Sequence, residues 1–143
     1  MNSRTIRVLC VDDNQALVDA LRIKLAAERD IEAVGHLLSA DELVEAVERM
    51  QPDIVLLDLD MPGRDPLAAL SELAVTHPHV RTIILSGYVR EDFINRALDA
   101  GAWGYVAKGE EPDVIVAALR RVASGNFAFG NEVAKHLRKS WTV

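Results

Sequence analysis

Two sequence periods alternate along the chain, and this alternation constrains the fold more than any other feature. Short apolar runs rich in β-branched residues, among them IRVLCV, IVLL and TIIL, are separated by segments whose apolar residues recur at helical spacing. Strands that alternate with helices in this way indicate βαβ units, which build a parallel sheet covered by helices on both faces. We therefore predict a three-layer, doubly wound α/β domain. The predicted strands are Ile6–Val11, Ile31–Leu37, Ile54–Leu57, Thr82–Leu85 and Tyr105–Ala107.

Residues typical of helix ends stand between these strands. Pro66 suits the first position of a helix, where its missing N–H is not needed. Gly101 and Gly125 are typical of the residue that follows a helix. Three aspartates precede predicted helices and are expected to act as N-caps, namely Asp12, Asp41 and Asp65.

Length and charge exclude several classes of protein. A chain of 143 residues favours one domain. Its net charge of −6 argues against a protein that mainly coats nucleic acid or an anionic membrane. No apolar run approaches the ~20 residues of a membrane-spanning helix, and the single cysteine, Cys10, cannot form an internal disulfide. We expect a cytoplasmic protein without membrane contact.

Charged and hydroxyl side chains follow four of the predicted strands. In open parallel α/β sheets the functional site lies in the crevice beyond the carboxyl ends of the strands. A single aspartate after a strand is usually a helix cap, and a single lysine is usually a solvated charge. A set of such residues at four different strand ends instead favours a functional site. The set consists of Asp12 and Asp13 after the first strand, Asp58 after the third, Ser86 after the fourth and Lys108 after the fifth.

Three carboxylates at one place repel one another unless a cation lies between them. Oxygen ligands of this kind suit Mg²⁺. A metal beside an aspartate, with an ammonium group and a hydroxyl opposite, matches the needs of phosphoryl transfer, in which the protein positions the group and neutralises its oxygens. An aspartate can itself be the nucleophile and form an aspartyl phosphate. Asp58 is the best candidate, because it ends the central strand between the acid pair and Lys108.

These motifs together resemble the receiver domain of bacterial two-component response regulators. The matching segments are Val-Asp-Asp at 11–13, Leu-Leu-Asp-Leu-Asp-Met-Pro-Gly at 56–63, Ile-Leu-Ser-Gly at 84–87 and Gly-Ala-Trp-Gly-Tyr-Val-Ala-Lys at 101–108. The resemblance implies a flavodoxin-like (βα)5 fold with strand order 2-1-3-4-5. This is the known strand order of a chemotaxis member of the same family. The first strand and the aromatic tail are most similar to the branch that carries a C-terminal LuxR-type helix-turn-helix.

The resemblance also implies a role for each acidic residue. Asp58 would accept a phosphoryl group from a histidine of a sensor kinase or a phosphotransfer protein. Mg²⁺ or Mn²⁺ would be held by Asp13 directly, by Asp12 largely through water, by Asp58, and by the backbone carbonyl of Asp60. The chain would then be a phosphoacceptor that assists only its own phosphorylation and dephosphorylation, and not an enzyme acting on other substrates.

Other residues would read out the phosphoryl group. Lys108 would pair with the phosphoryl oxygens and Ser86 would donate its hydroxyl to one of them. The ring of Tyr105 would turn inward as Ser86 moves, which would reshape the face made by the fourth helix, the fifth strand and the fifth helix. In this family, the positions of Asp60 and Tyr88 tune the lifetime of the phosphoryl group, but the direction of their effect here does not follow from the sequence.

The last segment is expected to lie outside the domain proper. We predict a receiver domain over residues 1–125 and a tail or linker over 126–143, with an aromatic turn at 126–130 and a short helix near Asn131–Lys139. A helix-turn-helix needs about 60 residues, and 143 − 125 leaves 18 after Gly125. No direct contact of this chain with nucleic acid is therefore expected, whereas formation of a homodimer remains open.

Two other functions remain open from the residues alone. Asp58-Leu-Asp60 superficially resembles the Asp-x-Asp of haloacid-dehalogenase-like phosphohydrolases. That motif normally ends the first strand, however, and the chain has no segment for a substrate-specificity cap. A pure interaction module with a vestigial site is the other alternative. It is disfavoured because the acid pair, Asp58, Ser86 and Lys108 are all present.

Overall fold

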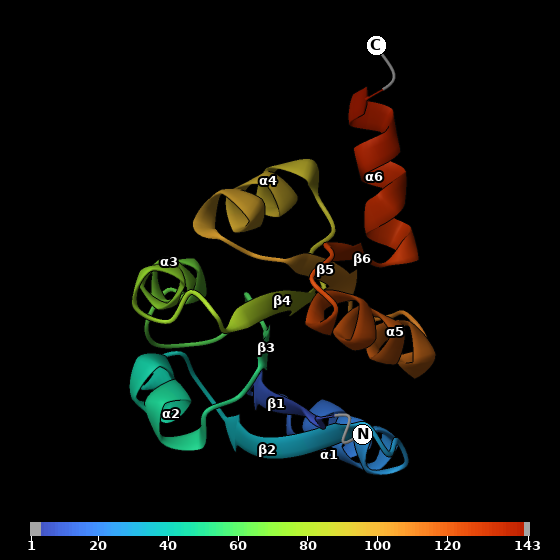
Figure 1. Ribbon diagram of the computed structural model, residues 1–143. Helices are drawn as coiled ribbons and strands as arrows, with labels where there is room; N and C mark the ends of the chain where they lie inside the picture. Colours follow the sequence, from blue (N-terminus) through green and yellow to red (C-terminus); the bar gives the residue numbers. More distant parts are fainter. Residues whose placement is uncertain (1–3, 142–143) are drawn as a thin grey trace.

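The computed structural model describes the backbone of residues 4–141 and the side chains of residues 4–137. A parallel sheet forms the middle of three layers, and helices cover both of its faces (Figure 1). The strands are β1 (Ile6–Val11), β2 (Ile31–Leu37), β3 (Ile54–Leu57), β4 (Arg81–Ser86), β5 (Gly104–Ala107) and β6 (Ala128–Phe129). The helices are α1 (Gln15–Ala26), α2 (Leu43–Met50), α3 (Pro66–Thr76), α4 (Glu91–Ala100), α5 (Pro112–Ala123) and α6 (Asn131–Trp141).

The order of the strands across the sheet is β2-β1-β3-β4-β5-β6. The predicted doubly wound order 2-1-3-4-5 is therefore confirmed, and a sixth strand extends it at the β5 edge. All neighbours pair in parallel, and the pairing register sets Val11 of β1 opposite Leu57 of β3. The central strands thus end level with one another, and the residues that follow them meet at one edge of the sheet.

Alternation of side chains along the strands divides the core between the two faces. On β3, Ile54 and Leu56 pack against α1 and α5, whereas Val55 and Leu57 pack beneath α2, α3 and α4. All four β3 side chains are at most 3% exposed. A strand buried in this way has no solvent-facing side, which explains why IVLL lacks the alternation of polar residues seen in half-exposed strands.

Two of the three predicted aspartate caps are wrong. Asn14, and not Asp12, caps α1, because its side-chain oxygen accepts the Leu17 N–H at 3.2 Å. Asp41 lies before the N-cap position of α2, which Glu42 occupies without a side-chain hydrogen bond. The carboxylates of both aspartates face other partners.

The remaining helix ends follow the sequence signals. The cap at Asp65 is confirmed, since its carboxylate accepts the Leu67 N–H at 3.2 Å and Pro66 begins α3. Gly101, which ends α4, has a left-handed φ of 111°, which a residue without a Cβ adopts at little cost. Gly125 follows α5 with a φ of 94°.

The tail forms more structure than its sequence indicates. Within the expected aromatic turn, residues 128–129 form the edge strand β6, paired with β5 from Gly104 to Tyr105. The strand was missed because two residues are too few for a periodic pattern. The predicted helix is present as α6 and extends to Trp141. It packs on β5 and α4, with Val133 fully buried (Figure 1). The division of the chain at residue 125 stays a prediction.

Among the residues that the structure describes, no helix is both long enough and apolar enough to cross a membrane.

Candidate functional site

The site lies where the winding of the sheet reverses, between β1 and β3. The chain leaves β1 toward one side of the sheet and leaves β3 toward the other, which opens a crevice beyond their carboxyl ends. Asp12 directly follows β1, and Asp58 directly follows β3. Their backbone amides continue the sheet, with the Asp12 N–H bonded to the Leu37 carbonyl and the Asp58 N–H to the Val11 carbonyl, each at 3.0 Å. The two buried strands therefore hold both carboxylates rigidly.

Three carboxylates meet in this crevice as predicted. One oxygen from each of Asp12, Asp13 and Asp58 lies within 4.8 Å of the others. Asp12 and Asp58 are 4% and 2% exposed, whereas Asp13 is open to solvent. Asp12 Oδ2 is buried and forms an ion pair with Lys108, and it has no other polar partner among the described residues. Hard oxygen ligands, an excess of negative charge and one open side are what a Mg²⁺ ion with its own waters requires.

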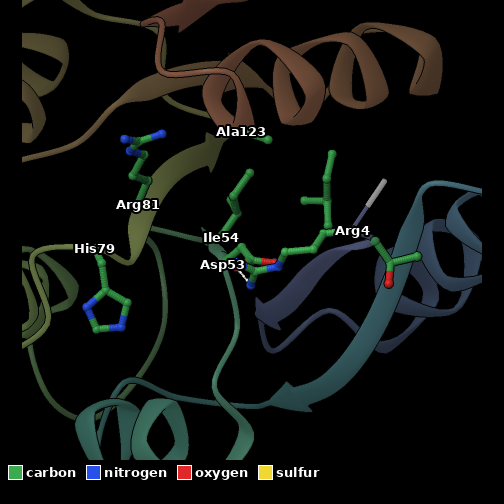
Figure 2. A pocket seen from close by; sticks show the side chains of 8 residues that line it. Arg4, Asp53, Ile54, His79, Arg81 and Ala123 are labelled. Carbon is green, nitrogen blue, oxygen red and sulfur yellow. Dashed lines mark hydrogen bonds and ion pairs between the residues drawn. The ribbon is translucent and has the colours of Figure 1, made fainter. Parts of the chain in front are cut away.

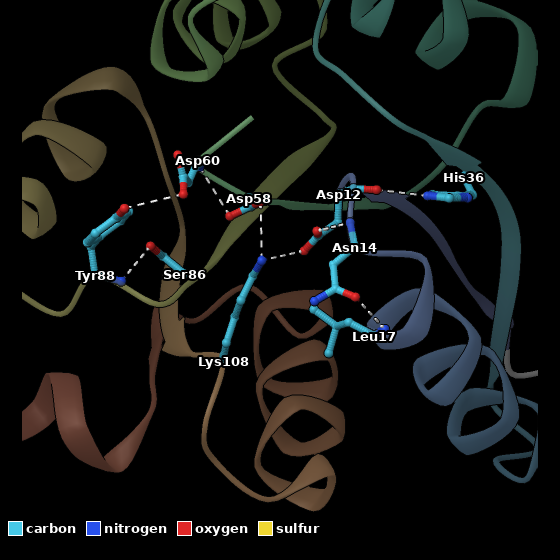
Figure 3. A network of polar contacts seen from close by, with 9 residues as sticks. All are labelled: Asp12, Asn14, Leu17, His36, Asp58, Asp60, Ser86, Tyr88 and Lys108. Atoms are coloured by element: carbon cyan, nitrogen blue, oxygen red, sulfur yellow. Dashed lines mark hydrogen bonds and ion pairs between the residues drawn. The ribbon is translucent and has the colours of Figure 1, made fainter. Parts of the chain in front are cut away.

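Lys108 supplies the positive charge of the site. Its Nζ lies 2.9 Å from Asp12 Oδ2 and 3.2 Å from Asp58 Oδ2, and Figure 3 shows the side chain reaching between the two carboxylates. Its backbone N–H is bonded to the Ser86 carbonyl at 2.9 Å, which extends the pairing of β4 and β5. Burial disfavours the charged ammonium group, but the ion pairs with Asp12 and Asp58 prevail and raise the pKa of Lys108.

The environment of Asp58 favours its neutral form more than water does. Burial raises the pKa of the Asp58 carboxyl, and the charge of Asp12 adds to this effect. The Asp60 N–H, bonded to Asp58 Oδ1 at 3.2 Å, and the Lys108 ammonium group act in the opposite direction without reversing it. One added cation would therefore relieve the repulsion between Asp12 and Asp58, which Lys108 alone offsets only in part.

Ser86 and the two tyrosines form a second network beside the carboxylates. Ser86 is fully buried, and its Oγ accepts the Tyr88 N–H at 2.9 Å. The Tyr88 hydroxyl reaches across to Asp60 Oδ2 at 3.3 Å (Figure 3). The Tyr105 ring is also fully buried, and its hydroxyl donates to the Tyr88 carbonyl. In this structure Tyr105 already lies inside the fold, and burial raises the pKa of its phenol group.

Two supporting residues were missed by the sequence prediction. Asn14 donates its N–H to Asp12 Oδ1 at 2.9 Å, so the same residue caps α1 and orients the carboxylate. His36 on β2 places Nε2 2.9 Å from the Asp12 carbonyl oxygen. An asparagine shortly before a helix is a cap signal that could have been read, whereas the contact of His36 depends on the pairing of β1 with β2.

The C-terminal segment also reaches the edge of the site. Glu110 Oε1 accepts the Asn131 N–H at the start of α6 at 2.8 Å, and the Gly130 N–H is bonded to the Tyr105 carbonyl at 3.0 Å. A cavity of about 410 Å³ beside Ser86 and Lys108 includes Glu132 of α6 in its wall. The helix therefore covers part of the β5 and α4 surface, and its first turn adds negative charge near the crevice.

A second pocket lies at the opposite, amino-terminal edge of the sheet. Figure 2 shows its lining, with Arg4 paired to Asp53 and with Arg81 and His79 nearby. Its volume is about 270 Å³, and Arg4 and Asp53 approach to 2.9 Å. Arg81, in contrast, donates to the Val122 carbonyl at 2.9 Å and lies over the Trp103 ring. Among the described residues that line this pocket, Asp53 is the one carboxylate, so the pocket lacks the buried group of like charges that marks the carboxyl edge.

A doubly wound sheet with carboxylates, a hydroxyl and a lysine at its switch point places the chain among the flavodoxin-like α/β domains. Residues 8–120 match the response regulator receiver domain family. The chain belongs to this family.

Relatives in sequence are transcriptional regulators. The transcriptional regulatory protein DegU of Brevibacillus brevis is 29% identical over 99% of this chain and 60% of its own length. The response regulator VraR of Staphylococcus aureus is 31% identical over 94% of this chain and 64% of its own length. The chain thus spans about two thirds or less of these curated relatives.

Solved structures share the fold. A LuxR-family two-component response regulator from an Aurantimonas species superposes with a TM-score of 0.89 at 26% identity, covering 95% of this chain and 97% of that one. The isolated receiver domain of RcsB from Salmonella enterica, solved with a phosphomimetic, has a TM-score of 0.84 at 20% identity, covering 92% and 98%. The first match extends nearly to the end of this chain, so it includes most of the tail.

Proposed function

We propose that the chain is a Mg²⁺-dependent phosphorylation switch in which Asp58 accepts a phosphoryl group from a phosphohistidine of a sensor kinase or a phosphotransfer protein. Family membership implies phosphorylation-dependent signalling in a two-component system. The observation that carries the residue assignment is the pairing of Lys108 Nζ with both Asp12 and Asp58 at the switch point of the sheet. The cytoplasm is the proposed location, since that is where such a kinase would present its phosphohistidine.

The proposed chemistry is an in-line displacement at phosphorus. Asp58 Oδ2 attacks the phosphorus of the phosphohistidine, the new P–O bond forms as the P–N bond breaks, and the imidazole nitrogen keeps the electron pair of the broken bond. Lys108 then exchanges its contacts with Asp12 and Asp58 for a contact with a phosphoryl oxygen. The Ser86 hydroxyl turns from the Tyr88 amide to donate to another. Both groups thus act on the charge that develops during transfer.

The acidic residues would hold Mg²⁺ beside this reaction. Asp12, Asp13 and Asp58 supply carboxylate oxygens, and the backbone carbonyl of Asp60 is the further proposed ligand. When bound, the ion supplies charge neutralisation for the phosphoryl oxygens and for the carboxylates. The sharing of one lysine by the buried Asp12 and Asp58 carboxylates and the raised pKa of Asp58 both support a cation here.

The output would pass through Ser86 and Tyr105 to the α4-β5-α5 face. Movement of the Ser86 hydroxyl toward the phosphoryl group removes the acceptor of the Tyr88 N–H, and Tyr88 in turn holds Tyr105. A shift of this equilibrium from 1:99 to 99:1 requires about 5.5 kcal/mol. A few charge-assisted hydrogen bonds worth ~1.5–3 kcal/mol each are enough to supply it. A homodimer and control of a DNA-binding domain are the proposed consequences, by analogy with the named regulators.

The test is the intact mass of the protein after incubation with Mg²⁺ and acetyl phosphate. We expect one added phosphoryl group in the wild type and none in Asp58→Ala or after removal of Mg²⁺ with a chelator. Beryllofluoride binding, followed by calorimetry, covers the case of rapid hydrolysis. Absence of both the adduct and beryllofluoride binding would refute the proposal in favour of an interaction module. Multiple turnover of a panel of phosphomonoesters would instead support a phosphohydrolase.

A further inference from the structure

The loop between β3 and α3 carries two of the proposed metal ligands. It runs from residue 58 to residue 65 and contains Asp58, whose carboxylate is a proposed ligand, and Asp60, whose backbone carbonyl is another. The loop is short, and two of its internal hydrogen bonds come from its own ends. The Asp60 N–H is bonded to Asp58, and Asp65 caps α3. Neither bond ties the middle of the loop to the rest of the fold.

A carboxylate from a different element makes that connection. Asp41, in the loop between β2 and α2, accepts the backbone N–H of Arg64 on Oδ1 at 2.7 Å. This is a charge-assisted bond to a main-chain donor, a stronger kind than a neutral hydrogen bond. Among the described residues, no other side chain from outside the loop and α3 bonds to the main chain of residues 59–65.

Gly63 is shaped for this contact. Its φ is +94°, and a Cβ placed on it would lie 2.6 Å from Asp41 Oδ1 and 3.1 Å from Asp41 Oδ2. A side chain at this position would thus collide with the carboxylate as well as strain the backbone. Two adjacent residues of the loop, Gly63 and Arg64, are therefore fitted to one carboxylate. The contact is a built feature of the loop and not a chance approach of a surface aspartate.

We infer that Asp41 is a positioning residue for metal binding. It holds the loop at Gly63 and Arg64, so that the segment Asp58–Asp60 keeps the conformation that Mg²⁺ binding needs, although Asp41 itself touches no reacting atom. The inference rests on the proposed function, since it concerns the same metal site. It also explains why Asp41 fails to cap α2, because its carboxylate is committed to the neighbouring loop.

The test measures Mg²⁺ affinity by calorimetry in metal-free protein that is not phosphorylated. Asp41→Ala should weaken Mg²⁺ binding about tenfold, at the lower end of the losses found when outer-shell partners of a metal site are removed. Asp41→Asn keeps an acceptor oxygen at the same place, so its affinity should return to within about twofold of the wild type. Amide hydrogen exchange in a peptide containing Arg64 should accelerate in Asp41→Ala only.

Asp53→Ala is the matched control. Asp53 likewise accepts a backbone N–H from another element, that of Arg7, at 2.9 Å, but it lies at the far edge of the sheet. It should lose a similar amount of stability toward urea while its Mg²⁺ affinity stays within about twofold of the wild type. This control separates positioning of the metal site from general loosening of the fold.

The possible failures are distinguishable. Unchanged Mg²⁺ affinity in Asp41→Ala would overturn the inference and leave the proposed function intact. Equal losses in Asp41→Ala and Asp41→Asn would overturn it too, since the negative charge and not the hydrogen bond would then matter. A wild type that binds Mg²⁺ but forms neither the phosphoryl adduct nor the beryllofluoride complex would refute the proposed function, while the affinities of the variants still decide the role of Asp41.

Discussion

The two edges of the parallel sheet place aspartates beside cations under opposite conditions. At the carboxyl edge Asp58 is 2% exposed and shares Lys108 with Asp12. At the amino edge Asp30, directly before β2, receives two bonds of 2.9 Å from the forked Arg120 guanidinium group in an exposed position. The pKa of Asp58 is raised, chiefly by burial, whereas the pKa of Asp30 is lowered, chiefly by its bond with Arg120.

The difference shows what each edge is suited to do. Asp30 shares Arg120 with Glu28, but all three side chains are partly exposed. Water therefore screens their charges, so Asp30 is satisfied as it stands and gains little from a further ligand. The buried carboxylates of Asp12 and Asp58 are not satisfied by the one lysine they share, because the cost of removing their charges from water is only partly offset. The same residue types therefore make a solvent-screened surface at one edge and, at the other, an incompletely neutralised acidic cluster that could hold a metal ion.

The largest predicted effect is that of Lys108→Met. In the absence of metal, the variant leaves Asp12 and Asp58 buried without a cation, and its free energy of unfolding at pH 7 should fall by about 2 kcal/mol, somewhat less than for a fully buried pair because Lys108 is partly exposed. Urea titration with and without Mg²⁺ measures this. Mg²⁺ should restore part of the loss, and phosphorylation by acetyl phosphate should slow about 100-fold. A variant as stable as the wild type would remove the contrast between the two edges.

The next effect is a pH dependence specific to Asp58. Because its pKa is raised on folding, the native state binds more protons than the unfolded state at pH values above the ordinary carboxyl value of 3.8, so its contribution to stability increases as the pH falls. Metal-free Asp58→Asn should be more stable than the wild type at pH 7, and this difference should shrink by pH 4.5. Urea unfolding of both proteins at the two pH values gives the comparison. A difference that grows on acidification would contradict the assigned shift.

Asp30→Asn should behave with the opposite sign. The pKa of Asp30 is lowered on folding by its bond with Arg120, so it contributes stability that is present above pH 3.8 and lost as the pH falls through its native pKa. The wild type should be the more stable protein at pH 7, and the two should converge only below about pH 3.8. The same urea series, extended to pH 3, tests this. Mg²⁺ should leave the difference in unfolding free energy between the wild type and Asp30→Asn unchanged.

The smallest effect is expected for Arg4→Met at the amino edge. Arg4 pairs with Asp53 at 2.9 Å, but its side chain is 82% exposed. Exposed pairs of this kind are worth little, so the free energy of unfolding should change by at most about 0.5 kcal/mol. Thermal or urea unfolding at low and high salt measures it. A loss as large as that of Lys108→Met would show that the amino edge is also a strained charge cluster.

Local patterns were sufficient for five of the six strands and for grouping the residues of the candidate site. The five runs of apolar residues predicted the strands to within one residue at each end, because burial on both faces imposes a composition that contiguous residues display. Asp12, Asp13, Asp58, Ser86 and Lys108 could be grouped before any coordinates, since parallel strands all end at the same edge. The resemblance of the motifs at 56–63 and 101–108 to receiver domains added the family, which the match over residues 8–120 confirms.

Other features depend on contacts between distant segments. Asp41 carries the local signal of a helix cap, yet its carboxylate bonds to Arg64, 23 residues away. The strand β6 has two residues and exists only because the β5 edge offers it partners. The capping of α6 by Glu110 likewise follows from the return of the chain to β5. In each case the local sequence permits several partners.

The sequence by itself determined which residues are apolar, where the strands end and which charges follow them. Those properties are set by neighbours along the chain and by the rule that parallel strands share a direction. Only the tertiary structure decided that Tyr105 is enclosed beneath Tyr88, that α6 lies over β5 and α4, and that Asp41 holds the loop of the proposed metal site. A side chain with one hydrogen bond to make takes the partner that packing brings within reach, and packing is a property of the whole fold.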